Sequence, residues 1–139
     1  MKIEVVAKTI ILNADGRLLI LRRHNNDTHR AGMWDLPGGQ VDIGEAPIAG
    51  AVREAYEETN LHIQSLRPVH IASKIHGQCQ VIKAIFTTTE YHNEISLSEE
   101  HSEYAWISIE DFLRLSISSD YKAAARLLQS ISSPAFHQV

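Results

Sequence analysis

The sequence predicts a single domain of the α/β (α+β) class, with a mixed β-sheet sandwiched between helices. The chain has 139 residues, which is enough for one domain with a hydrophobic core and short for two. Short apolar, β-branched runs indicate strands, and other stretches have helical periodicity. Because these elements mix without strict strand–helix alternation, we expect helices on the faces of one mixed sheet. We expect the domain to cover residues 1–139, with a loosely held tail at 132–139.

The chain begins with a predicted β-hairpin. Residues 5–12 are apolar and rich in β-branched side chains, and residues 17–23 form a second run of this kind. The Asp15-Gly16 pair between them supplies the positive φ that tight hairpin turns need. Three further segments follow: a mobile polar loop at 24–33, a short extended piece at 34–36 and a turn at 37–39.

The clearest helix is predicted from Pro47 to Thr59. A proline suits the first turn of a helix, and Asn60 can end it in the left-handed conformation. Ala46 is a poor N-cap, so this helix breaks one local rule. The later predicted elements are strands at 68–74, 81–91 and 104–107, a helix at 109–115 capped by Ser108, and a helix at 121–131 capped by Asp120.

Three glutamates of the 47–59 helix fall on one narrow face. At about 100° per residue, Glu54, Glu57 and Glu58 lie within an arc of roughly 100°. Gly50 lies on the same face, where the missing side chain would leave room for something bound. The rest of the circumference forms a broad apolar back made of Ile48, Ala49, Ala51, Val52, Ala55, Tyr56 and Thr59.

Two interpretations of this acidic face remain open. It can be an ordinary solvated surface, since Glu favours helices and Arg53 can neutralise Glu57 at i,i+4. It can also be a cation site. Glu54 and Glu58 repel each other at i,i+4, and both stand in the C-terminal half of the helix, where the helix dipole disfavours anions. A sequence that accepts both penalties favours a site for Mg²⁺ or Mn²⁺, which carboxylate oxygens bind well.

The same helix carries a family resemblance. Residues 39–61 resemble the box that defines the Nudix hydrolases, with Gly39 first and every charged position at the right spacing. Those charged positions are Glu45, Arg53, Glu54, Glu57 and Glu58. The chain is similar to MutT-like members with a single Nudix domain, and the resemblance covers residues 3 to about 131. Two residues depart from the pattern: Ala55 is smaller than the usual aliphatic residue, and Asn60 replaces a glycine.

The resemblance implies a role for each residue of the box. Glu54, Glu57, Glu58 and the Gly38 carbonyl would bind the divalent metal, Arg53 would orient the glutamates, and Gly39 and Glu45 would support the site. Glu57 and Arg53 would thereby serve catalysis. In many relatives a further metal ligand or the general base comes from a loop after the box, and residues 98–106 look like that loop. Glu100 is the best candidate, with Glu103 and Glu99 behind it; the alternative is a plain acidic loop.

Candidate substrate contacts lie before the box. Arg22 and Arg23 end a strand that points toward it, and because adjacent strand residues face opposite sides, at most one can reach a phosphate. Arg30 in the polar loop is a third candidate. Each of the three can equally be a solvated charge. Trp34 can stack on a base, although core packing accounts for it as well.

The chemistry implied by the resemblance is Mg²⁺-dependent hydrolysis of the diphosphate linkage in a nucleoside diphosphate derivative, with Mn²⁺ as a possible substitute. A nucleoside triphosphate, ADP-ribose and a sugar nucleotide all remain open as substrates. The alternatives are a non-catalytic Nudix-fold binding or regulatory module and an RNA 5′-end pyrophosphohydrolase. A net charge of −4 without basic clusters argues against long nucleic acid.

The expected cellular location and partners of the protein follow from two features that the sequence lacks. Cys79 is the only cysteine, so no internal disulfide can form, and a cytoplasmic protein is expected. No apolar run approaches about 18 residues, so we expect no membrane partner. The protein is expected to be a monomer or a homodimer.

Overall fold

The computed structural model describes residues 1–26 and 31–131. Arg30, part of the loop predicted at 24–33 and the tail predicted at 132–139 lie outside these ranges.

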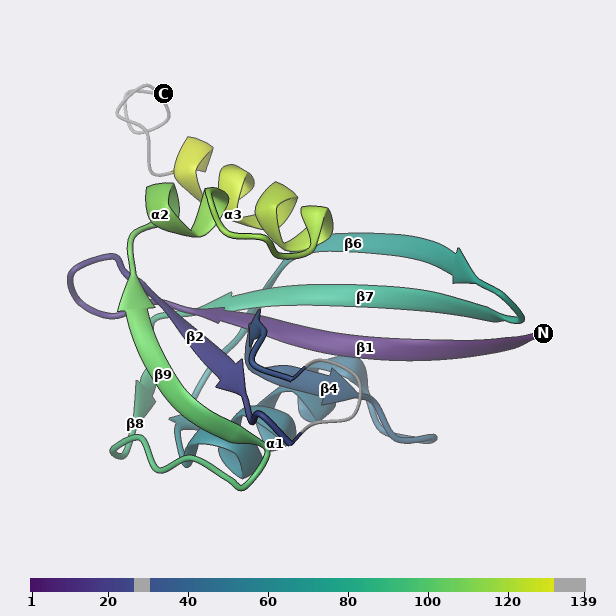
Figure 1. The fold of residues 1–139 in the computed structure, drawn as a ribbon, viewed down its shortest axis with the longest axis horizontal. Coiled ribbons are helices and arrows are strands. Elements are labelled where there is room, and N and C mark those ends of the chain that lie inside the picture. Colours follow the sequence, from purple (N-terminus) through teal and green to yellow (C-terminus); the bar gives the residue numbers. More distant parts are fainter. Residues whose placement is uncertain (27–30, 132–139) are drawn as a thin grey trace.

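The larger sheet contains β4 (Gly38–Gln40), β1 (Lys2–Ile11), β7 (Cys79–Thr88) and β6 (Arg67–His76), in that order (Figure 1). β1 and β7 pair in parallel along their whole length, and the other two pairings are antiparallel. This sheet is therefore mixed, as the sequence predicted.

The remaining strands form two smaller groups. A three-stranded antiparallel sheet contains β3 (Trp34–Asp35), β2 (Leu18–Arg23) and β9 (His101–Ile107), in that order. A separate two-stranded ladder joins β5 (His62–Ile63) to β8 (Tyr91–His92).

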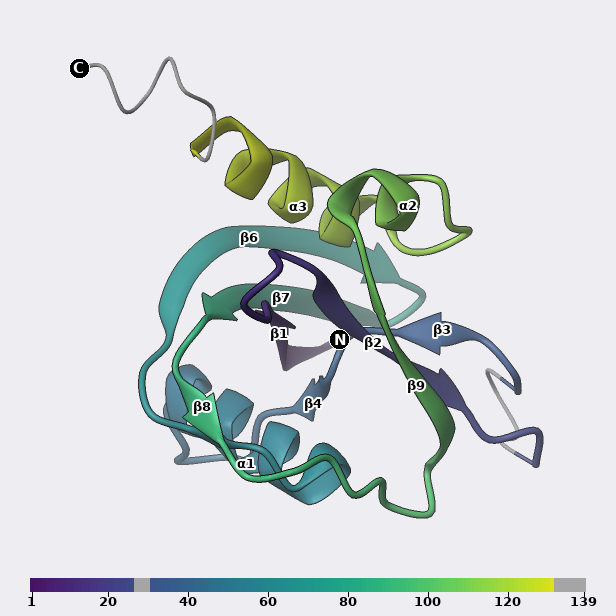
Figure 2. The same ribbon diagram turned by 90° about the vertical axis from the view of Figure 1, so that its left-hand side faces the viewer.

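Helices lie on both faces of the larger sheet. α1 (Pro47–Thr59) covers one face, and α3 (Ser119–Ile131), with α2 (Ile109–Leu113) beside it, covers the other (Figures 1 and 2). This arrangement confirms the predicted fold class. No helix within 1–26 and 31–131 is both long and apolar enough to cross a membrane.

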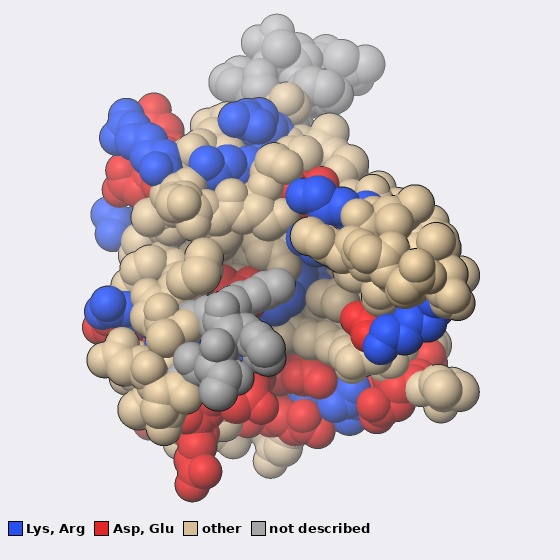
Figure 3. All heavy atoms as spheres, turned by 45° about the vertical axis from the view of Figure 1, so that its right-hand side comes forward, with Lys and Arg blue, Asp and Glu red and all other residues tan. Residues whose placement is uncertain are grey.

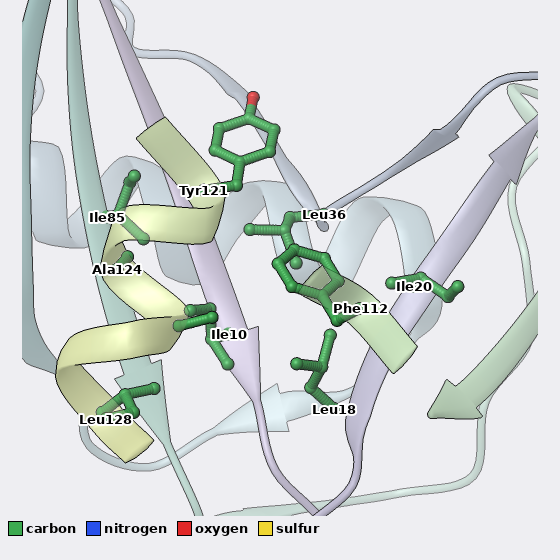
Figure 4. Close-up of a cluster of buried hydrophobic side chains, with 10 residues drawn as sticks. Ile10, Leu18, Ile20, Leu36, Ile85, Phe112, Tyr121, Ala124 and Leu128 are labelled. Atoms are coloured by element: carbon green, nitrogen blue, oxygen red, sulfur yellow. The ribbon is translucent and has the colours of Figure 1, made fainter. Parts of the chain in front are cut away.

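The main hydrophobic core lies between the larger sheet and the α2–α3 pair (Figure 4). Phe112 of α2 is fully buried there. The cluster draws on β1, β2, β7 and both helices, and its largest members are Ile10, Leu18, Ile20, Leu36, Ile85, Phe112, Tyr121 and Leu128.

The hairpin predicted from residues 5–23 is only a turn with one bridge. The turn exists, since the Asn13 N–H donates to the Arg17 carbonyl at 2.9 Å, and Leu12 bridges Leu18. Beyond that bridge the strands separate into different sheets. The physical reason is burial: residues 7–11 and 18–21 are buried at every position, so each run is covered on both faces.

Three other local predictions were wrong. The turn predicted at 37–39 is instead mostly strand, because Gly38–Gln40 pairs with β1. The loop predicted at 98–106 becomes strand β9 from His101 onward. The side chain that caps the N-terminus of α3 is Ser118, not the predicted Asp120. The Ser118 hydroxyl oxygen accepts a hydrogen bond from the Asp120 N–H at 3.3 Å.

Candidate active site

The side chains of two glutamates of helix α1, Glu54 and Glu58, point toward the interior of the protein. Its boundaries are those predicted, with Asn60 in the left-handed conformation at φ 68° and no side-chain cap from Ala46. The expected broad apolar back is wrong in part, since Ile48 and Tyr56 are 44% and 49% exposed. The small side chains of Ala51 and Ala55 pack against the sheets instead, so the buried face extends from these alanines to the glutamates.

Gly50 makes room for a side chain of this protein rather than for a ligand. A Cβ at this position would lie 2.9 Å from Oε1 of Glu45. The Glu45 carboxylate therefore passes over the helix at Gly50 on its way to Arg53. The expectation that Gly50 clears space for something bound was wrong.

Arg53 donates hydrogen bonds to three of the acidic residues of the box. Its Nε and Nη2 donate to the two oxygens of Glu45 at 2.8 and 3.0 Å, and its Nη1 donates to Glu54 at 3.1 Å and to Glu57 at 3.2 Å. The hydrogen bonds from Arg53 lower the pKa of Glu45 to about 2. The ion pair expected between Arg53 and Glu57 is present. Arg53 thus holds these three carboxylates in fixed positions, and of the three only Glu57 has a half-exposed side chain.

Glu54 lies directly against Gly39. A Cβ at residue 39 would come within 2.8 Å of the carboxyl carbon of Glu54. Glycine is therefore required in β4 so that the Glu54 carboxylate can lie on the strand. Burial raises the pKa of Glu54, and the neighbouring Glu57 and Glu100 raise it further.

Glu58 is the most buried carboxylate of the box, at 4% exposure. It accepts the Gly38 N–H at 2.8 Å. Gly38 has a φ of 140°, and a Cβ there would collide with the Ala7 carbonyl of β1, so only glycine can occupy the position. Burial first, and then Glu54 and Glu100, raise the pKa of Glu58 to about 8.

Glu100 and His101 complete the cluster from the other side. Single ligand atoms of Glu58, Glu100 and His101 all lie within 4.8 Å of one another. Glu100 is exposed, whereas His101 is 5% exposed. Of the other two acidic residues considered, Glu103 forms an ion pair with Arg22 at 2.7 Å, and the side chain of Glu99 is exposed.

The donor set of this cluster fits a divalent cation. Glu54, Glu58 and Glu100 repel one another, and a cation would supply the missing positive charge. Carboxylate oxygens suit Mg²⁺ and Mn²⁺. The alternative interpretation of this helix face as an ordinary solvated surface fails for Glu58, because its side chain is almost inaccessible to water.

Lys8 is a buried cation that sequence analysis missed. Its Nζ donates to Asp35 at 3.0 Å, to the Leu36 carbonyl at 3.2 Å and to the Gly38 carbonyl at 3.1 Å. Burial would lower the pKa of Lys8, but Asp35 and Glu58 outweigh it and the pKa is raised. Burial would likewise raise the pKa of Asp35, and Lys8 outweighs it and lowers that pKa. A lysine inside the apolar run at 5–12 was the signal that could have revealed this pair.

The arginines predicted to contact substrate have different environments. Arg22 donates to Glu103 at 2.7 Å and to the Gly32 carbonyl at 3.0 Å, so it holds the β2–β9 edge. Arg23 points elsewhere, to within 3.6 Å of Asp35. Their opposite directions agree with the strand argument. Arg30 lies outside the described residues.

Two neighbouring cavities share part of their lining, and the second of them lies beside β4. One of about 250 Å³ is lined by Arg23, Met33, Trp34, Asp35, Lys83, Ile117, Ser118 and Tyr121. The other, of about 230 Å³, includes Gly39 and Lys8 and shares Arg23, Lys83 and Tyr121 with the first. Sequence analysis missed Lys83 and Tyr121, because β7 and α3 come together only in the folded chain. Figure 3 shows acidic side chains gathered at the level of α1, with basic ones among them and in a hollow above.

Comparisons with known proteins agree with this geometry. The NUDIX domain family model matches residues 2–128. The chain is 40% identical over 55 residues to a MutT-like protein of Streptomyces ambofaciens, covering 40% of this chain and 32% of that protein. It is 31% identical over 97 residues to the asymmetrical bis(5′-nucleosyl)-tetraphosphatase of Mus musculus, covering 65% of each. The solved MutT protein from Methanosarcina mazei Go1 has a TM-score of 0.82 at 28% identity, covering 95% of this chain and 97% of that one.

The chain therefore belongs to the NUDIX domain family. The family match confirms the resemblance to MutT-like Nudix proteins, and relatives named as pyrophosphatases agree with the predicted class of enzyme. The alignments span 32% and 65% of the lengths of the two curated relatives above, so the reaction of this chain is a separate question.

Proposed function

We propose that this chain is a Mg²⁺-dependent hydrolase that cleaves the diphosphate linkage of a nucleoside diphosphate derivative. The observation that carries the proposal is the approach of Glu100 and His101 to the buried Glu58, next to Glu54. Single ligand atoms of Glu58 in α1, Glu100 in the turn before β9 and His101 in β9 lie within 4.8 Å of one another, and Glu54 is a charged neighbour of Glu58. The cavity of about 230 Å³ is lined by Gly39, against which the Glu54 carboxylate lies.

Glu54 and Glu58 would hold the metal, with Glu57 and the Gly38 carbonyl as further ligands. Each carbonyl oxygen has two lone pairs, so the Gly38 oxygen can accept from Lys8 and still face a cation. The Arg53 contacts keep Glu54 and Glu57 on one side of the helix, and Glu45 and Gly39 support that arrangement. When bound, the cation would neutralise the diphosphate and make water more acidic.

Glu100 is proposed as the general base. It is exposed and lies at the solvent side of the cluster, where an attacking water can reach it. The Glu100 carboxylate would take the proton of that water as its oxygen attacks phosphorus. Arg53 and Lys8 carry the fixed positive charges that keep the surrounding carboxylates in place.

The nucleoside is proposed to lie in the cavity between β2, β7 and α3. Trp34 lines this cavity and offers an aromatic face to a base, while Arg23 and Lys83 offer donors to phosphate or ribose. Tyr121 closes the cavity wall, with the Lys83 Nζ 4.9 Å over its ring. The wall therefore combines apolar and cationic groups, as a nucleoside diphosphate derivative requires.

A single catalytic domain over 1–139, a cytoplasmic location and the choice between monomer and homodimer remain predictions.

A parallel turnover assay tests the proposal. Nucleoside triphosphates, ADP-ribose, a sugar nucleotide, a dinucleoside tetraphosphate and a 5′-triphosphorylated RNA are incubated with Mg²⁺ or Mn²⁺, and the products are resolved. At least one compound should be cleaved at its diphosphate linkage, and EDTA should abolish turnover. Glu100→Gln should lower kcat by roughly a hundredfold or more, while Glu110→Gln, an exposed glutamate of α2, should leave it unchanged. No turnover of any compound with either metal would refute the hydrolase and favour a binding module.

A further inference from the structure

The segment that leads to Glu100 runs antiparallel alongside the end of α1. The pairing starts in the β5–β8 ladder, where His62 lies opposite His92. It continues past the end of the helix, where the Ser96 N–H donates to the Thr59 carbonyl at 2.9 Å and the Ser98 N–H donates to the Glu58 carbonyl at 3.1 Å. Figures 1 and 2 both show this segment passing along α1 on its way to β9.

Two asparagines join the ladder to the helix end. Asn60 and Asn93 are the only non-glycine residues with positive φ in the described ranges 1–26 and 31–131, at 68° and 82°. The Asn60 side-chain amide donates to the Glu94 carbonyl at 3.1 Å, and the Asn93 side-chain amide donates to the Asn60 carbonyl at 3.1 Å. Each side chain thus donates to a backbone carbonyl of the other segment, and we name these two residues the asparagine clasp.

The asparagine clasp affects the candidate site because the segment that it holds leads directly to Glu100. The carbonyls of residues 58, 59 and 60, which the helix itself leaves unbonded, all receive donors from residues 93–98. Only one residue separates Ser98 from Glu100, whose carboxylate approaches Glu58. The carbonyl and the carboxylate of Glu58 are therefore both tied to this segment, one by Ser98 and the other by the approach of Glu100.

We propose that Asn60 and Asn93 are positioning residues that lock residues 93–98 onto the end of α1 and thereby hold Glu100 opposite Glu58. A glycine at residue 60, as in the family pattern, would keep the left-handed helix end but has no side chain to donate to Glu94. The asparagine that departs from the Nudix box thus adds a tether. The functional half of this inference rests on the proposed role of Glu100.

Asn60→Gly tests the clasp, because it keeps the backbone conformation and removes the donor. Metal-free amide hydrogen exchange should become about five- to tenfold faster at Ser96 and Ser98, the loss expected for one hydrogen bond. Turnover should lose roughly tenfold in kcat with a smaller change in KM, because a displaced base affects the chemical step more than binding. Asn13→Gly is the matched control. It removes side-chain hydrogen bonds in the β1–β2 turn and should change neither readout.

A double-mutant cycle with Glu100→Gln separates positioning from general stability. If Asn60 acts through Glu100, Asn60→Gly should change kcat by less than about twofold in the Glu100→Gln background. An equal loss in both backgrounds would overturn the proposal, and so would unchanged exchange at Ser96 and Ser98. Wild-type kcat in Glu100→Gln alone would instead refute the role of Glu100 in the proposed function, while the exchange data would still decide whether the clasp exists.

Discussion

Replacing Glu58 with Gln should stabilise the metal-free protein and abolish its activity. Glu58 is buried, and its pKa is raised from the usual 4.5 to about 8. A carboxyl group with a raised pKa contributes stability below pH 4.5 that is lost as pH rises toward and through about 8, because the unfolded chain ionises first. At pH 7, about 2.5 units above 4.5, the loss amounts to about 3 to 4 kcal/mol at about 1.4 kcal/mol per unit.

Glutamine avoids this loss and can still accept the Gly38 N–H. In EDTA at pH 7, Glu58→Gln should therefore melt roughly 10 °C above the wild type, and the difference should disappear toward pH 4.5. With Mg²⁺ the order should reverse, because the wild type gains stability by binding the cation and the variant does not. Turnover of the variant should fall by roughly a hundredfold or more.

Thermal melts at pH 5 and pH 7, with EDTA and with Mg²⁺, check each part of this prediction. The matched control is Glu57→Gln, which makes the same change on the same helix at a half-exposed side chain. If Glu58→Gln melts at or below the wild type in EDTA at pH 7, the carboxyl is not held in an unfavourable environment and the reasoning is wrong.

Three further predictions address neighbouring residues. Glu57→Gln should change metal-free stability by less than about 1 kcal/mol and lower Mg²⁺-dependent turnover by roughly a hundredfold; an undiminished rate would remove Glu57 from the site. Lys8→Met leaves Asp35 buried at 3% exposure without its main partner, so denaturant unfolding should reveal a loss of about 3 kcal/mol, which near-wild-type stability would contradict. Gly39→Ala places a Cβ 2.8 Å from the carboxyl carbon of Glu54. Because this contact is with the end of a side chain rather than with backbone, the melting temperature should barely change, while turnover falls by roughly tenfold or more. Normal turnover in that variant would mean that the position of Glu54 is not critical.

The helix at the centre of the site could be predicted because its signals are local. Pro47 and Asn60 set its ends by their own backbone preferences, and the structure begins and ends α1 where the sequence predicted. The spacing of Glu54, Glu57 and Glu58 follows from helical geometry alone, and so does the contact from Arg53 to Glu57. The class of fold was also accessible, since the mixture of strands and helices restricts how layers can form.

What the sequence did not reveal depends on segments that meet only after folding. The hairpin prediction failed because a local turn at Asp15-Gly16 does not decide which sheet a strand joins. That choice depends on burial of residues 7–11 on both faces. The same limit applies to the apolar back of α1, where close packing of Ala51 and Ala55 against the sheets left Tyr56 exposed.

The sequence by itself determined the acidic helix, its boundaries and the spacing of its glutamates. The tertiary structure decided the charge state and the partners of those side chains. Burial in a low-dielectric interior raises the pKa of Glu58, and long-range pairing brings Lys8 from before α1 and Glu100 from after it to this carboxylate. Spacing along a helix is a property of local geometry, whereas burial and charge proximity depend on the whole fold.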